Sequence, residues 1–212
     1  MKYFLVSSLL YLLMYTPISA DIKNQTAISN NSKFKINYQT EFNLLNIQDT
    51  KTYKTLKKIP VIDITGQTSS ISAIHVANAR SSFMVALKDS PEIWEINYQH
   101  PAPSGFGEWV HDYREDSGEA IVMSFPIRRL RLKAPLDDFF FDNDFVKIFS
   151  VSCTGKIQII DLDLGRRIAT MNISDDIQRH SNLNEVLGLT TNYLRDIQIR
   201  ASNFRLENCP SK

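Results

Sequence analysis

The chain has 212 residues, with 24 Lys and Arg against 23 Asp and Glu, and 43% of its residues are hydrophobic. This hydrophobic content, with a net charge near zero, excludes an intrinsically disordered chain and a nucleic-acid binder that works through bulk positive charge. Seven glycines leave little material for Gly-rich phosphate loops, and the sequence contains neither GxGxxG nor GxxxxGK[ST].

Residues 1–20 have the pattern of a secretory signal peptide. Lys2 precedes an apolar run from Tyr3 to Tyr15, and small residues lie at the end of the segment. The run is shorter than the roughly 20 apolar residues that span a bilayer. We therefore expect cleavage after Ala20, no membrane span afterwards, and a periplasmic or secreted product. The alternative is a retained N-terminal anchor.

The two cysteines, Cys153 and Cys209, leave a disulfide and two free thiols equally open. Disulfides persist in the compartment that a signal peptide implies. Because the sequence contains no CxxCH and no CxxC pair, we expect neither c-type haem nor a zinc site, and no other metal site.

Residues 21–42 are polar and predict a loose leader. Over residues 43–173, apolar residues alternate with polar ones across short segments, as strands with one buried face require. Phe83, Val85 and Leu87, for example, share one face of a predicted strand. This alternation predicts an all-β fold.

The segment 146–173 predicts three short strands in a meander, and it resembles the unit around residues 83–98. Antiparallel strands at about ten-residue spacing are typical of a propeller blade, a sandwich or a small barrel. A four-stranded blade takes about 40 to 50 residues, so the chain predicts about three antiparallel propeller-type blades with exposed sheet edges. Residues 174–212 form a divergent tail. Within it, the spacing of apolar residues over 181–200 favours a helix capped by Ser181 or Asn182. Part of this segment also alternates like a strand.

Three strings carry a family likeness: ARSSFMVALKDSPEIWEINY (79–98), GEWVHDYRED (107–116) and FPIRRLRLKAPLDDFFFDNDF (125–145). Together they resemble the cytochrome d1 haem domain family, which includes periplasmic nitrite reductases and proteins of d1 haem biosynthesis. The resemblance covers about residues 49–173. It implies a part, about three blades, of an eight-bladed propeller that holds d1 haem at its central axis, with nitrite as the anion substrate in the reductases.

The resemblance also implies site residues. His111 in WVHD matches the distal His-Asp turn of the family, where the histidine gives protons to the substrate; the alternative is a turn histidine bonded to Asp112. Arg129 and Arg131 share one strand face and are candidates for binding a haem propionate or another anion, against a solvated face that nearby acids neutralise. His75 is expected to be an ordinary strand residue rather than a ligand.

Two features set the chain apart from the whole family domain. The blades that carry the proximal haem ligand have no counterpart, and the Pro-His-x-Gly-x-Gly turn of the family is replaced by IQRHSNLN, which contains His180. The aromatic run Phe139 to Phe141 is expected in the blade core, and the acids around it in turns.

We therefore expect a periplasmic d1 haem-domain-like protein related to nitrite reductase or d1 haem biosynthesis, truncated relative to the family and without independent activity. Whether it is an enzyme stays open, because most of the haem pocket has no counterpart. The alternative function is a non-enzymatic secreted β module that associates with a partner chain, or with itself, through open sheet edges. A third reading is a decayed reading frame with a marginally stable product.

Overall fold

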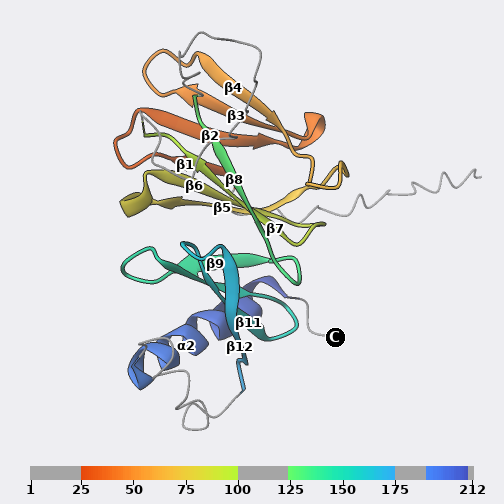
Figure 1. Ribbon diagram of the computed structural model, residues 1–212, viewed down its shortest axis with the longest axis vertical. Coiled ribbons are helices and arrows are strands. Elements are labelled where there is room, and N and C mark those ends of the chain that lie inside the picture. Colours follow the sequence, from red (N-terminus) through yellow and green to blue (C-terminus); the bar gives the residue numbers. More distant parts are fainter. Residues whose placement is uncertain (1–24, 100–123, 175–189, 210–212) are drawn as a thin grey trace, which may run out of the picture.

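The computed structural model describes residues 25–99, 124–174 and 190–209. They form three antiparallel sheets of four strands, each in sequence order across the sheet. Figure 1 shows the sheets stacked along the long axis of the molecule, with one helix beyond the third sheet. The predicted all-β fold with about three propeller-type blades is confirmed.

Each blade is a continuous stretch of the chain. The strands and their bounds are, in blade 1, β1 (Thr26–Ile28), β2 (Phe34–Gln39), β3 (Leu44–Asp49) and β4 (Thr55–Pro60); in blade 2, β5 (Ile71–Ala77), β6 (Ser82–Leu87), β7 (Glu92–Asn97) and β8 (Ile127–Arg131); and in blade 3, β9 (Asp138–Phe141), β10 (Lys147–Val151), β11 (Lys156–Asp161) and β12 (Arg166–Asn172). Short 3-10 turns, η1 (Thr40–Phe42) and η2 (Asn78–Arg80), join β2 to β3 and β5 to β6.

The inner edge of the stack is set by the first strand of each blade. β1 contacts β5, and β5 contacts β9, whereas β4, β8 and β12 form the opposite edges of their sheets. In a propeller, the strands that converge in this way line the side of the central axis. The outer edge of the stack is therefore formed by β4, β8 and β12.

Blade 2 lies between the other two blades, so its middle strands are buried on both faces. Phe83, Val85 and Leu87 share one face, as predicted, and belong to the same hydrophobic cluster as buried residues of blade 1 such as Ile36 and Leu45. Met84 and Ala86, on the other face of β6, pack against blade 3. The sequence predicted one buried face per strand; the second face is buried because a neighbouring sheet covers it.

Two predicted boundaries differ in the structure. Residues 26–39, within the predicted leader, form β1 and β2, because Ile36 and Tyr38 alternate with polar residues and pack against blade 2. The C-terminal helix is present as α2 (Thr191–Asn208), and its cap is Thr190, whose hydroxyl accepts a hydrogen bond from the Tyr193 N–H. The predicted caps Ser181 and Asn182 lie outside the described residues.

Cys153, in the turn between β10 and β11, and Cys209, just after α2, are joined by a disulfide with 5.5 Å between their Cα atoms. This pairing resolves the two alternatives that the sequence left open. No helix in the described parts of the chain has the length and hydrophobicity of a membrane span.

Candidate functional site

The inner edge carries one polar pair that joins two blades. His75 on β5 and Asp138 on β9 lie 2.6 Å apart between Nε2 and Oδ1, and their side chains are 28% and 24% exposed. The His75 ring also meets the Phe139 ring edge to face at 4.7 Å. The imidazole is therefore held by contacts to blade 3 on the side of the stack where the inner strands converge. As expected, His75 is a strand residue, and its Nε2 is engaged by a carboxylate.

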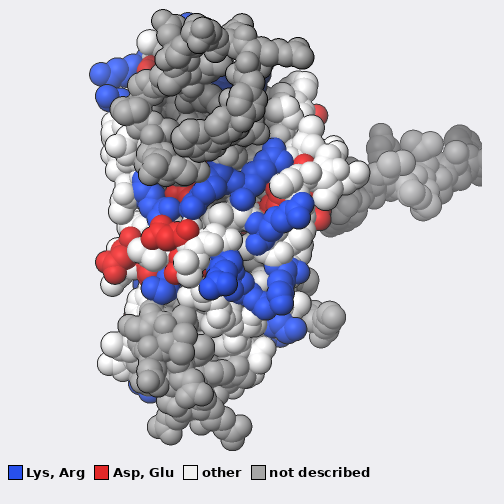
Figure 2. Space-filling view, in the orientation of Figure 1, with Lys and Arg blue, Asp and Glu red and all other residues white. Residues whose placement is uncertain are grey.

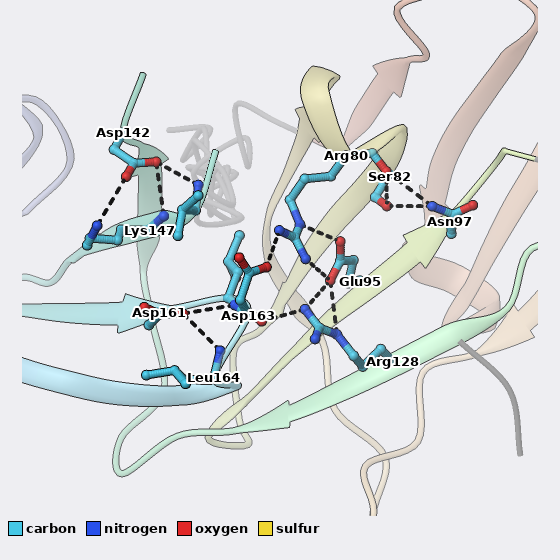
Figure 3. A network of polar contacts seen from close by, with 12 residues as sticks. Arg80, Ser82, Glu95, Asn97, Arg128, Asp142, Lys147, Asp161, Asp163 and Leu164 are labelled. Atoms are coloured by element: carbon cyan, nitrogen blue, oxygen red, sulfur yellow. Dashed lines mark hydrogen bonds and ion pairs between the residues drawn. The ribbon is translucent and has the colours of Figure 1, made fainter. Parts of the chain in front are cut away.

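A second polar network joins blades 2 and 3 farther out, and Figure 3 shows its members. Glu95 on β7 is buried, and its Oε1 accepts a hydrogen bond of 2.8 Å from Nε of Arg80. Its Oε2 accepts a hydrogen bond from the guanidinium of Arg128 on β8. Arg80 also reaches Asp163 in the β11–β12 turn at 2.7 Å, while Arg128 donates to the Leu162 carbonyl. One buried carboxylate is thus held by two arginines that also bind blade 3.

The electrostatics of this network favour the charged form of Arg80. Burial would lower the pKa of Arg80, but the carboxylates of Glu95 and Asp163 outweigh it and raise that pKa above its usual value. Both oxygens of Glu95 accept hydrogen bonds from arginines. The network connects the two blades through the contacts of Arg80 and Arg128 with blade 3.

The sequence analysis missed this network for a definable reason. Glu95 alternates with Trp94 and Ile96, so the period-2 pattern places it on a solvent face. Only the burial of both faces of blade 2, together with arginines in η2 and β8, shows that Glu95 is interior. A charged residue inside an apolar strand is the single sequence signal that points to it.

The predicted anion-binding residues Arg129 and Arg131 lie exposed on β8. The guanidinium of Arg129 lies 4.7 Å from the centre of the Trp94 ring, a cation–π contact. Figure 2 shows that Lys and Arg side chains form a band over the region where β8 crosses the front of Figure 1. Since β8 is the outer strand of blade 2, both arginines lie on the opposite edge of that sheet from His75.

The predicted catalytic residue, His111, lies outside the described residues, and so do Asp112 and His180. Its assignment stays a prediction. Among the described residues, no group of three or more His, Cys, Asp or Glu side chains is placed to hold a metal ion.

A cavity of about 330 Å³ opens between blades 1 and 2. It is lined by Phe34, Leu56, Tyr98, Gln99, Ser124 and Phe125. The rings of Phe34 and Phe125 meet edge to face, with their centres 5.1 Å apart. Nζ of Lys57 lies close by, where it donates to the backbone carbonyls of Ser124 and Phe125, and burial lowers the pKa of this amine. Of the six described lining residues, Phe34, Tyr98 and Phe125 are aromatic, and none of the six is a histidine.

The family resemblance implies d1 haem, which needs an imidazole for the iron and cations for its carboxylates near one another. In the described residues these groups do not meet. The single described histidine, His75, has Nε2 bonded to Asp138, while Arg129 and Arg131 lie on the outer strand of blade 2. The described part of the chain therefore does not by itself form a haem site.

Comparison with known proteins supports the predicted family. Residues 17–117 match the family model of the cytochrome D1 heme domain. The dihydro-heme d1 dehydrogenase of Pseudomonas aeruginosa is 31% identical over 127 residues, which are 59% of this chain and 22% of that protein. The chain thus spans about a fifth of the length of the curated relative that it matches.

Solved structures give the same picture. The structure of the dihydro-heme d1 dehydrogenase NirN in complex with DHE is similar with a TM-score of 0.56 and 28% identity, covering 70% of this chain and 28% of that one. A β-propeller domain from Myceliophteria thermophila has a TM-score of 0.51 at 9% identity, covering 72% of this chain and 44% of that one. The second likeness supports the propeller-type fold alone. The predicted resemblance is therefore confirmed over part of the chain, and residues 17–117 are identified as similar to the cytochrome d1 haem domain.

Proposed function

We propose that this chain is a periplasmic protein of the d1 haem branch, related to the proteins of d1 haem biosynthesis rather than to the reductases, and without turnover of its own. The observation that carries the proposal is the 31% identity to a dihydro-heme d1 dehydrogenase over 127 residues. The solved structure of that name, in complex with DHE, is similar over 70% of this chain at 28% identity.

The absence of independent turnover is proposed from the arrangement of the described residues. Asp138 occupies Nε2 of His75, and the exposed arginines of β8 lie on the outer edge of the stack. An enclosed tetrapyrrole site needs its ligand and its cations to converge from several elements. His111 stays the candidate for any contact with haem, because WVHD is the string that resembles the distal turn of the family.

The periplasmic location rests on two features of the chain. One is the pattern of residues 1–20, and the other is the disulfide between Cys153 and Cys209. Disulfides are rare in a reducing cytosol and persist in the periplasm. Mass analysis of the exported protein tests this part: we expect an N-terminus at Asp21 and a mass lower by two hydrogen atoms than that of the dithiol form.

Titration of the purified chain with dihydro-heme d1, followed by the Soret and long-wavelength bands, tests the haem part. We expect weak binding at most, which His111→Ala removes and which Arg131→Gln leaves unchanged, and no conversion of the bound haem. A stoichiometric low-spin complex or turnover of dihydro-heme would show that the chain is an independent enzyme. Binding that survives His111→Ala would remove the residue assignment.

The alternative function, association of a secreted β module through open sheet edges, has a physical obstacle. The charged residues of the outer strands β4, β8 and β12 are all Lys or Arg. Basic side chains on edge strands oppose pairing with a second edge of the same kind. At these edges an acidic partner is therefore favoured over a second copy of the same edge.

A further inference from the structure

The outer edge of blade 2 has no neighbouring strand among the residues that the structure describes. The sheet order is β5-β6-β7-β8, so β8 pairs with β7 on one side alone. Beyond both ends of β8 the ladder is continued by hydrogen bonds from the Leu132 N–H to the Pro91 carbonyl and from the Asn97 N–H to the Pro126 carbonyl. The even-numbered residues of β8 therefore hold the positions that bond to β7.

The odd-numbered residues of β8 turn their backbone groups the other way. Backbone groups alternate in direction along an antiparallel strand, so the N–H and C=O groups of Ile127, Arg129 and Arg131 point out of the sheet edge. Within the described ranges, no backbone hydrogen bond joins these groups to another strand. An edge of this kind is a template on which an extended chain can pair.

The same odd-numbered residues give the edge a basic face. Ile127 packs against the hydrophobic cluster that blades 1 and 2 share, and Arg129 lies over the Trp94 ring, so this face of β8 is turned toward blade 1. Arg129 and Arg131 are exposed, and so is Lys133, two residues farther along the chain. These cations belong to the band of Lys and Arg side chains that Figure 2 shows. Free backbone groups and cations therefore lie on one edge.

Three of the acidic residues that follow β8 in the sequence are engaged elsewhere. Asp137 accepts a hydrogen bond from a backbone N–H of the β10–β11 turn, Asp138 is paired with the histidine of the inner edge, and Asp142 accepts bonds from its own turn. Among the described residues, neither Arg129 nor Arg131 forms an ion pair with a carboxylate. The positive charge of this edge is therefore available to an acidic partner.

We propose that β8 is a docking edge for an acidic extended segment of another protein, which adds a further antiparallel strand to blade 2. The partner residues opposite Arg131 and Arg129 are Asp or Glu, and the residue opposite Ile127 is apolar. In the direction of the partner chain, acidic residues stand at the first and third positions and an apolar residue at the fifth. Cross-strand pairs of opposite charge, and of two apolar side chains, stabilise such a sheet.

The backbone of β8 favours a polypeptide over other polyanions. Phosphate groups of a lipid surface or a nucleic acid can accept hydrogen bonds from the outward N–H groups, but they donate nothing to the outward C=O groups. Alternate side chains of a strand lie about 6.7 Å apart, a spacing that Arg129 and Arg131 share with the acids of an extended partner. A second copy of the edge is disfavoured, because the charged residues of β4, β8 and β12 are Lys and Arg.

Fluorescence anisotropy of a labelled peptide of this pattern, titrated with the full chain at low ionic strength, tests the proposal without haem. The peptide carries glutamate at the first and third positions, valine at the fifth and threonine between them. We expect saturable binding that weakens about threefold for Arg129→Gln or Arg131→Gln and about tenfold for both together. Lys51→Gln, an exposed lysine of the β3–β4 turn, is the matched control and should leave binding unchanged.

A second peptide with N-methyl groups on both glutamates keeps every charge but cannot donate to the outward C=O groups, so it should bind about tenfold more weakly. Equal binding of the two peptides would overturn strand pairing. Unchanged binding to the double-glutamine chain, or no binding to a wild-type chain that circular dichroism shows to be folded, would overturn the docking edge. Tighter binding to phosphatidylglycerol vesicles or duplex DNA, lost in the double-glutamine chain, would assign the edge to those polyanions instead.

Discussion

The two faces of blade 2 meet their neighbours by different means. Toward blade 1, Phe83 and Trp94 supply large apolar side chains that are fully buried. Toward blade 3, the corresponding positions of the same strands are smaller, with Met84, Ala86 and Ile93. The interface with blade 3 therefore has less apolar volume, but it also contains ion pairs. The His75–Asp138 pair crosses this interface, and the Arg80–Glu95–Arg128 network supports it from blade 2.

The comparison shows that the stability of an interface and the alignment of its two sheets have different physical sources. Burial of apolar area is non-directional and stabilises many arrangements of two sheets. The hydrogen bonds that cross to blade 3, from Arg80 to Asp163 and from Arg128 to the Leu162 carbonyl, are directional, so they are satisfied in one arrangement only. We therefore expect the blade 1 interface to contribute more to global stability, and the blade 3 interface to be more sensitive to the loss of a single polar group.

The most disruptive variants should be the neighbours Phe83→Ala and Met84→Ala, which point to opposite faces of β6. Truncation of a buried aromatic residue costs about 4 kcal/mol, and truncation of a buried methionine about 3 kcal/mol. Chemical denaturation followed by fluorescence of the buried Trp94 measures both. A larger loss for Met84→Ala would reverse the proposed ranking of the two interfaces.

Glu95→Gln should be the next largest, with a loss of about 2 to 3 kcal/mol. Removing one partner of a buried ion pair leaves the other charges uncompensated, although both arginines keep some contact with water, at 18% and 23% side-chain exposure. The matched control is Asp163→Asn in the same network. Its side chain is 60% exposed, so we expect a change below about 0.5 kcal/mol. Equal effects of the two variants would mean that burial of Glu95 does not matter.

His75→Gln tests the inner edge and should cost about 1 kcal/mol, the usual net value of a hydrogen bond in a partly exposed position. The glutamine keeps a donor but loses the ring contact with Phe139. Arg131→Gln, an exposed residue of the same blade, is the control and should be neutral. Thermal unfolding of the two proteins side by side is sufficient, and a neutral His75→Gln would show that the pair adds nothing to the blade 3 interface.

Much of this architecture is predictable from the chain. The alternation of residue types in β6, β7, β10 and β11, with turns between the strands, is a local signal. It is readable from the sequence whichever antiparallel sheet the strands belong to. β1 and β2 escaped prediction because polar residues outnumber Ile36 and Tyr38 in their segment, so composition hid the alternation. The expected helix is confirmed over the part that the structure describes, as α2 with Thr190 as its cap, while the expected caps Ser181 and Asn182 lie outside the described residues.

The site was less predictable, because its polar contacts join residues far apart in sequence. His75 meets Asp138, and Arg80 meets Asp163, across the boundary between blades. No spacing rule links such partners. The single cysteine pair is similar: two thiols in the sequence allow a bond, but only the position of α2 on blade 3 brings Cys209 to Cys153.

The smallest expected effect concerns the connection between blades 1 and 2, and it depends on pH. Hydrogen bonds from the Thr65 hydroxyl, the Gln67 N–H and Ser90 lower the pKa of Asp63 to about 2, from an ordinary value of 3.8. Because the folded pKa lies below the unfolded one, this carboxylate stabilises the fold fully above about pH 4, and its contribution is lost as the pH falls toward 2.

Asp63→Asn removes that dependence, since asparagine does not titrate. The difference in unfolding free energy between the wild type and Asp63→Asn should therefore be constant from pH 5 to 7 and shrink between about pH 4 and pH 2. Urea denaturation at a series of pH values measures it. A difference that grows on acidification would mean that the carboxylate is bonded more favourably when protonated, and that the turn contributes to the blade 1 interface in another way.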